Sequence, residues 1–313
     1  MNIKIQPGET GLLSNTTLRV RIGDACCTLN CRDPEVYNYL SGLYSSFLSD
    51  SPAAISMELD IIEKFDQQEI SSAESRWTVL RWGPVIAGIY RLSENEAGGP
   101  LCTVSVAVEK YLFDPSLGCK IKNLLIPMVY YTVRDRDRNA LPAMLVHSCG
   151  ILRHGKLLLF AAPSEMGKTT VARLCGDEHG QVVNDEMLLL SAGEENAAPT
   201  GQGVPIIGGV DRRTNAKAPL ACVLMLKQSE RTSLRRLDRL EAYLRFMRQV
   251  IAPRAFNGGS DDTKEMLAET TAFSDRVTKA VPFYELEFTP ESGPLWEAIA
   301  GLEKTLAGGE LSR

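Results

Sequence analysis

A glycine, a lysine and a threonine stand together shortly after an apolar run, at Gly167, Lys168 and Thr169. The run Lys156–Ala161 is too short for an ordinary helix and predicts a buried strand. The segment matches the pattern GxxxxGK followed by Ser or Thr, except that Ala162 replaces the first glycine. The candidate nucleotide-binding residues are Ala162, Pro163, Ser164, Glu165, Met166, Gly167, Lys168, Thr169 and Thr170.

This spacing is typical of a turn that binds phosphate. Its backbone N–H groups point inward at phosphate oxygens, next to the positive end of a helix dipole. Lys168 would reach the β- and γ-phosphates of a nucleotide, and the Thr169 hydroxyl would take one position on Mg²⁺. A strand before the loop, a helix continuing through 171–174 and a later strand that carries acids are the context that such a motif requires, so we expect nucleotide binding.

Two carboxylates interrupt the next apolar run, at 181–190. Asp185 and Glu186 follow the loop lysine by the length of one helix and a turn, so both runs can be neighbours in one sheet. Carboxylates beside the phosphates can hold Mg²⁺ or accept the proton of an attacking hydroxyl. An Asp-Glu pair alone is usually a solvated turn, so this assignment depends on the loop.

A histidine lies on the strand-like run 144–151 that precedes the loop. A single His on an apolar strand, such as His147, is more often a hydrogen-bonded structural residue than a catalytic one. His154 and His179 are expected at the surface.

The run with His147, the loop and the acid pair together resemble the HPr kinase/phosphorylase-like family over residues 147–190. The resemblance implies an α/β fold, with a P-loop kinase domain of the HPr kinase/PEP carboxykinase-like type after a smaller β-rich N-terminal α+β domain. It also implies transfer of the γ-phosphoryl group of ATP, with Mg²⁺, to a Ser or Thr hydroxyl of a protein or peptide. His147 would lie beside Asp185 and orient that carboxylate or tune its basicity.

The resemblance assigns catalytic roles to His147, Lys168, Asp185 and Glu186, and it assigns Mg²⁺ to Thr169 with one of the acids. We favour Asp185 as the base and Glu186 as the metal partner, although the two acids can exchange these roles. A small hydroxylated metabolite is the nearest rival acceptor. A nucleotide-binding module without turnover, which would engage a partner through its N-terminal domain, stays an alternative.

The loop departs from the family pattern Gly-x-Ser-Gly-x-Gly-Lys-Ser, because Ala162 and Glu165 replace two glycines. If Glu165 needs a positive φ, it carries strain that glycine would not. Its charge must also point away from the nucleotide. The Gly/Asn-rich stretch of the bifunctional relatives is not found after the acids, which favours a kinase-like relative.

At 313 residues the chain is long enough for roughly two domains. The polar run at 135–138 predicts an N-terminal mixed β-rich domain at 1–139 and a kinase-like domain at 140–313. The net charge of −5, without a long basic run, argues against nucleic acid as a partner. The resemblance also allows a homo-oligomer.

The 8 cysteines in a chain of this size predict reduced thiols and a cytoplasmic location. Cys26, Cys27 and Cys31 lack paired metal-ligand spacing and are expected in the core. The first residues lack the pattern of a signal peptide. The longest apolar stretch, 124–133, contains Pro127 and is too short to span a membrane, so no membrane partner is expected.

The N-terminal half is expected to be rich in strands. Alternating polar and apolar residues at 17–22 and 56–61 predict half-buried antiparallel strands. Further strands are expected at 77–82, 85–91 and 101–108, and a helix at 120–133. Between the first two strands, Asp33, Pro34 and Glu35 predict a helix start. The expected apolar face of that helix is Val36, Leu40, Leu43, Phe47 and Leu48.

The segment 191–217, rich in Gly, Ala, Pro and Asn, predicts a long loop that faces phosphate or substrate. Its charged residues are Asp211, Arg212, Arg213 and Lys217, and a solvated role is as plausible for the arginine pair. A second basic cluster, with Arg235, Arg236 and Arg239, is expected on a solvated helix surface leading to 250. Strands at 221–226 and 283–288 and helices at 260–281 and 294–306 complete the prediction.

Overall fold

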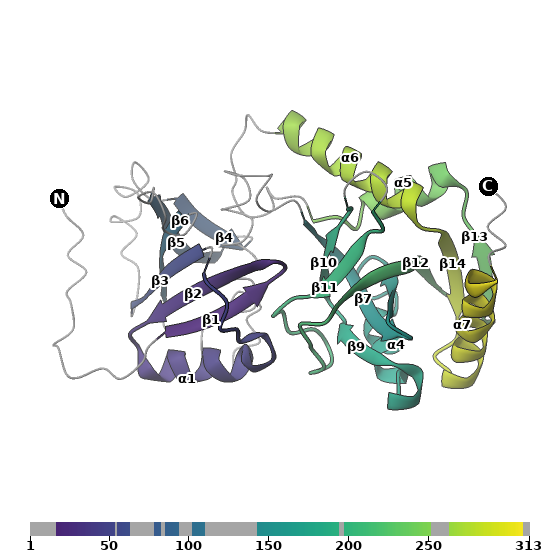
Figure 1. Ribbon diagram of the computed structural model, residues 1–313, viewed down its shortest axis with the longest axis horizontal. Coiled ribbons are helices and arrows are strands. Elements are labelled where there is room, and N and C mark those ends of the chain that lie inside the picture. The colour runs from purple at the N-terminus through teal and green to yellow at the C-terminus, as the bar shows by residue number, and fades with distance from the viewer. Residues whose placement is uncertain are drawn as a thin grey trace. The chain divides into compact units, whose positions relative to one another are not determined.

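Figure 1 shows the computed structural model of the chain, in which the described residues are 17–53, 55–62, 78–82, 85–93, 102–109, 143–193, 197–251 and 263–308. The chain divides into two compact units. The first comprises residues 1–141 and 253–258, and the second comprises 142–252 and 259–313. The helix expected at 120–133 lies outside the described residues.

The first unit is built on a six-stranded sheet with the order β1-β2-β3-β6-β5-β4. Its described strands are β1 Thr17–Ile22, β2 Ala25–Cys31, β3 Ile55–Ile62, β4 Thr78–Trp82, β5 Val85–Ser93 and β6 Cys102–Glu109. The prediction of antiparallel pairing is right for β1, which pairs with β2, but wrong for β3, which runs parallel to both β2 and β6. A helix connects β2 to β3, and such a crossover is what parallel neighbours need.

That helix is α1, Pro34–Leu43, and it begins where the sequence indicates. The Asp33 carboxylate accepts hydrogen bonds from the N–H groups of Glu35 and Val36, at 3.0 and 3.1 Å. This caps backbone donors that the first helical turn leaves unpaired. Leu48 was expected on the buried face but is 47% exposed, because it follows the helix and bridges to β1.

The second unit contains an eight-stranded sheet with the order β11-β10-β7-β8-β12-β14-β13, and β9 pairs with β7 beside β10. Strands β8, β12 and β14 are parallel, and the other pairings are antiparallel. The elements are β7 Met144–Arg153, β8 Lys156–Ala161, α4 Lys168–Leu174, β9 Gln181–Asn184, β10 Met187–Ser191, β11 Thr200–Gly203, β12 Lys217–Gln228, β13 Ser233–Arg236, α5 Arg239–Met247, α6 Thr263–Ala280, β14 Phe283–Phe288 and α7 Ser292–Ala307.

Helices cover both faces of this sheet (Figure 1). One apolar cluster joins the sheet to α5 and α6 through residues such as Phe246 and Phe273. The other joins it to α4 and α7 through residues such as Val171 and Ile299. Because period-2 alternation sends successive side chains to opposite faces, the parallel strands supply apolar residues to both clusters, and β14 also carries Glu285 and Glu287.

Two predictions for this unit need correction. The stretch 191–217 is not one long loop, because β11 pairs with β10 on one side and with β12 on the other. These pairings close a ring through β7, β8, β12, β11 and β10. Arg235 and Arg236 are not on a helix but on β13, which adds to the sheet beside β14.

Within the ranges given above, no helix is long and apolar enough to cross a membrane.

Candidate functional site

The glycine-lysine-threonine loop begins where β8 ends, at the carboxyl edge of the three parallel strands. Ligands of open α/β sheets bind outside this edge. The ends of the other two strands also contact the loop. Gln228, the last residue of β12, donates a hydrogen bond to the Glu165 carbonyl oxygen at 3.0 Å. Phe288, the last residue of β14, packs against Gly167.

Gly167 can only be glycine in this arrangement. Its φ is +106°, in the region that side chains disfavour, and it immediately precedes α4. A Cβ atom built on Gly167 would lie 2.5 Å from Cζ of Phe288, which is closer than real Cβ contacts come. The sequence pattern found this residue, but the aromatic ring that restricts it could not be foreseen.

Lys168 turns its side chain into the loop. It is 5% exposed, and its ammonium donates hydrogen bonds to the carbonyl oxygens of Ala162 and Pro163, each at 3.0 Å. A buried ammonium needs such partners, because an unpaired charge in the interior is costly. The positive charge therefore lies at the centre of the turn.

Glu165 adopts a positive φ of 67°, the conformation in which the sequence analysis anticipated strain. A residue with a Cβ atom pays about 1–2 kcal/mol for left-handed backbone. The Glu165 side chain is exposed.

The acid pair occupies the bend between β9 and β10, which both pair with β7. Buried Asn184 fixes this bend. Its side-chain oxygen accepts hydrogen bonds from the N–H groups of Glu186 and Met187, at 2.8 and 3.0 Å. Its amide group donates to the carbonyl oxygens of Val204 and Ile206, at 3.1 and 2.9 Å. Asn184 therefore positions the acids and also holds the segment that follows β11.

Asp185 is fully buried, and this segment packs against it. Its Oδ2 accepts a hydrogen bond from the Gly209 N–H at 2.9 Å. Oδ1 is buried and has no hydrogen-bond partner among the described residues. A Cβ atom on Gly208 would collide with Oδ1, and one on Gly209 would lie 2.9 Å from the Thr169 hydroxyl oxygen. The Gly208–Gly209 backbone thus contacts both the acid and the threonine.

His147 lies beside the second acid, whereas the resemblance implies a position beside the first. Its Nε2 lies 3.9 Å from Oε1 of Glu186, and the Glu186 side chain is 25% exposed. The cause is the register of the sheet, in which His147 pairs with Met187, the residue that follows the acid pair.

Burial raises the pKa of the Cys149 thiol well above its usual value. The negative charge of Asp185 raises this pKa further, and the positive charge of Lys168 lowers it. His147 and Cys149 share one face of β7, since side chains two residues apart do so in a strand. The loop lysine, Asp185 and this face of β7 are therefore close enough to interact electrostatically.

The two arginines of the segment that was expected to face phosphate or substrate have protein partners. Arg212 donates to the Cys175 carbonyl oxygen at 2.7 Å, and Arg213 pairs with Asp211 at 3.1 Å. The buried Nη1 of Arg213 has no hydrogen-bond partner among the described residues. The prediction of a surface position is right for His154, which is exposed, and the His179 side chain is 25% exposed. His179 stacks on Trp296 at a centroid distance of 4.8 Å.

Sequence reasoning gave no role to Asn184, Gly208 and Gly209. A signal was present, because an asparagine before an acid pair favours a side-chain-bonded turn. Cys26, Cys27 and Cys31 are buried, as predicted. In the described part of the chain no three His, Cys, Asp or Glu side chains form a metal-binding group.

The fold and site define a mixed α/β protein with a glycine-lysine-threonine loop at the carboxyl edge of its parallel strands. The model of the family described as SynChlorMet cassette protein ScmC matches residues 115–304, more than half of the chain, so the chain belongs to this family. That family differs from the one that the sequence motifs resemble.

Among solved structures, the Hpr(Ser) kinase/phosphatase from Coxiella burnetii is 14% identical, with 52% of this chain and 93% of that chain covered, at a TM-score of 0.30. The similarity is remote, and we transfer no residue role from it. No curated protein matches the chain.

Proposed function

We propose that this protein is an ATP-dependent kinase that transfers the γ-phosphoryl group to a hydroxyl, with a P-loop domain of the HPr kinase-like type. One observation carries the proposal. The buried Asp185 leaves Oδ1 without a partner, and the same glycine pair contacts both Asp185 and Thr169. An unpaired buried carboxylate oxygen is costly unless a cation or a donor completes it.

The residues present fit Mg²⁺ and a nucleotide. Carboxylate and hydroxyl oxygens are the protein ligands that Mg²⁺ prefers, and Lys168 offers its ammonium for phosphate oxygens. ATP would supply the phosphoryl group, and Mg²⁺ would balance its charge. Lys168 and the loop backbone would bind the phosphates, with Lys168 exchanging its bonds to two loop carbonyls for bonds to phosphate.

The geometry supports the exchanged roles of the two acids. Asp185 is buried and reaches Thr169 through the glycine pair, so it would be the metal partner. Glu186 is partly exposed and pairs with His147, so it would accept the hydroxyl proton, and His147 would hold its carboxylate in place. The acceptor would be a Ser or Thr of a protein or peptide, with a hydroxylated metabolite as the rival.

Nucleotide binding and transfer test the proposal separately. We expect Lys168→Ala to weaken Mg-ATP binding in calorimetry by tenfold or more, whereas exposed Lys264→Ala leaves it unchanged. Glu186→Gln should retain binding and lose transfer of labelled phosphate to peptides or metabolites. Asp185→Asn should lose both the Mg²⁺ dependence of binding and transfer. Full transfer by Glu186→Gln and Asp185→Asn would refute the roles assigned to the two acids. Absence of transfer by the unsubstituted protein to every acceptor offered would refute the kinase proposal.

A nucleotide-binding module without turnover is the second candidate. The Glu165 charge in the loop and the Gly209 hydrogen bond to Asp185 favour it, because both oppose entry of a phosphate-metal complex. In that case Lys168→Ala would still weaken nucleotide binding, but the unsubstituted protein would transfer no phosphate to any acceptor.

A further inference from the structure

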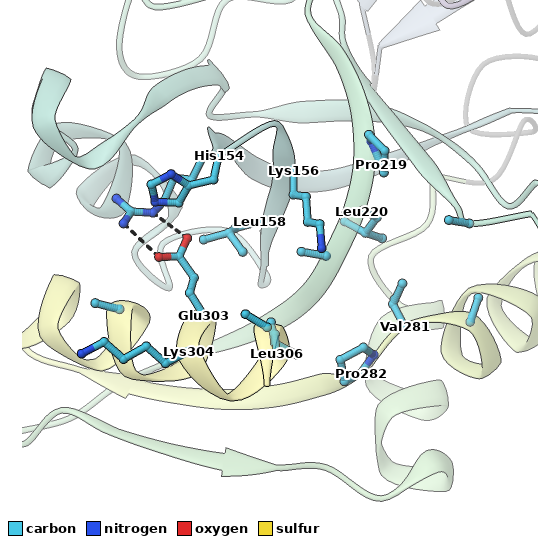
Figure 2. Close-up of a pocket in the computed structure, with 16 residues that line it drawn as sticks. His154, Lys156, Leu158, Pro219, Leu220, Val281, Pro282, Glu303, Lys304 and Leu306 are labelled. Atoms are coloured by element: carbon cyan, nitrogen blue, oxygen red, sulfur yellow. Dashed lines mark hydrogen bonds and ion pairs between the residues drawn. The ribbon is translucent and has the colours of Figure 1, made fainter. Parts of the chain in front are cut away.

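A cavity of about 730 Å³ lies at the opposite end of β8 from the glycine-lysine-threonine loop (Figure 2). Its walls come from the end of β7 and the turn after it, the starts of β8 and β12, the end of α6 and the last turns of α7. Lys156 lines the cavity at the first residue of β8, and the loop follows the last residue, Ala161. A six-residue strand is about 17–20 Å long, so the two sites are separate.

The walls of the cavity are mainly aliphatic. They include Leu158, Leu220, Val281, Pro282 and Leu306, together with several alanines. Small-molecule sites have volumes of roughly 300–1,000 Å³ and are lined chiefly by apolar side chains. Both the size and the lining of this cavity therefore suit a small molecule with an aliphatic chain.

The charged groups at the cavity leave an excess of positive charge. Arg153 and Glu303 neutralise each other through two hydrogen bonds, at 2.8 and 3.0 Å. The side chains of Lys156 and Lys304 are exposed and form no hydrogen bond or ion pair within the part of the chain that is described. Figure 2 shows Lys156 extending from β8 into the lined space, between the sides formed by Leu158 and Leu220. An unpaired ammonium beside apolar walls favours an anion attached to an apolar group.

We propose that this cavity binds an aliphatic carboxylic acid. The aliphatic chain would pack against Leu158, Leu220 and Leu306, and the carboxylate would pair with Lys156. Burial of the CH₂ groups would supply affinity, and the lysine would select the charge. This inference does not depend on the proposed kinase function, because the cavity and the loop share no residues.

Binding of decanoate below its micellar concentration tests the proposal. We expect calorimetry on the full chain, without nucleotide, to show one site for decanoate. Decyltrimethylammonium, which has the same chain with the opposite charge, should bind at least about tenfold more weakly, and acetate, which lacks the chain, should not bind detectably. Equal affinity for the two amphiphiles, or no binding of decanoate, would overturn the proposal.

Charge variants locate the site. Lys156→Glu should weaken decanoate binding about tenfold, because it replaces an attraction with a repulsion. Lys264→Glu, the same change at the distant start of α6, should leave binding unchanged. Lys156→Gln removes only the charge and should give a smaller loss in the same direction. Unchanged affinity in both Lys156 variants would refute the assignment.

A second copy of the chain is the other occupant to test. If sedimentation shows a dimer that Leu306→Glu dissociates and decanoate does not, the cavity is an interface between copies and the carboxylic-acid proposal fails.

Discussion

Two residues of the same loop have left-handed backbone, but with opposite consequences. Gly167 adopts its φ of +106° without strain, whereas Glu165 adopts +67° with a side chain. The Gly167 position also lacks room for a Cβ atom, because the ring of Phe288 lies against it. The loop therefore requires glycine at Gly167, whereas at Glu165 it keeps its left-handed backbone although a side chain is present.

Gly167→Ala should lower the free energy of unfolding by about 3 kcal/mol, the sum of left-handed strain and overpacking against Phe288. It should also abolish nucleotide binding, since the turn can no longer form as it does now. Urea unfolding and calorimetry measure the two effects. Gly301→Ala is the control, because α7 is helical there and a Cβ atom meets nothing within 4 Å. This control should stabilise by about 0.5–1 kcal/mol.

Glu165→Gly should increase Mg-ATP affinity severalfold, because it removes a negative charge from the loop. Its free energy of unfolding should change by less than about 1 kcal/mol, since relief of strain is offset by the greater freedom of glycine in the unfolded chain. Glu165→Gln separates the two causes, because it retains the strained residue and removes only the charge. If Glu165→Gln does not raise affinity while Glu165→Gly does, backbone shape rather than charge limits binding.

At the scale of elements, the bend between β9 and β10 is joined to the segment after β11 by one side chain. Asn184 makes hydrogen bonds to both, so the acid pair and the glycine pair Gly208–Gly209 are held in one arrangement. The positions of the acid pair and the glycine pair therefore depend on residues between strands, not on residues within them.

Asn184→Ala should lower the free energy of unfolding by about 3 kcal/mol, because it leaves buried backbone donors and acceptors unpaired. Asn184→Asp keeps the acceptor for the bend and loses the donor to Val204 and Ile206. If the bend alone matters, Asn184→Asp should retain Mg-ATP binding that Asn184→Ala loses. Equal loss in both variants would show that the link to the segment after β11 is also required.

At the scale of the molecule, the second unit buries thiols between its sheet and its helices. Burial raises the pKa of Cys222 from 9.0 to about 12, and Glu303 raises it further. Burial also raises the pKa of Cys175 to about 11, although Arg212 and Arg153 oppose this increase. Both folded-state pKa values lie above the unfolded value, so the stability present below pH 9 is lost as pH rises toward 11–12.

Between pH 8 and pH 10, Cys222 should therefore account for a loss of about 1 kcal/mol of unfolding free energy. Urea unfolding at the two pH values measures it. Cys222→Ala should show a smaller loss over this interval than the unsubstituted protein. Val223→Ala, a neighbouring core truncation without a titratable group, should show the full loss. An equal pH dependence in the unsubstituted protein and Cys222→Ala would contradict the prediction.

The sequence by itself determined the features that depend on neighbouring residues. The start of α1 follows from Asp33 and Pro34, and strand β14 and the loop at Gly167 lie where the sequence predicts them. Local hydrogen bonds and side-chain periodicity are encoded within a few residues, so a single sequence suffices for them.

Only the tertiary structure decided which distant segments meet. Phe288 against Gly167, the glycine pair against Asp185, and His147 beside Glu186 all depend on strand order and register. Strands β7, β8, β10 and β12 are similarly apolar, so any of several pairings would bury them, and the apolar pattern does not distinguish one neighbour from another. These contacts of the loop and the acid pair, and the cavity at Lys156, form because packing of the whole sheet selects one of those pairings.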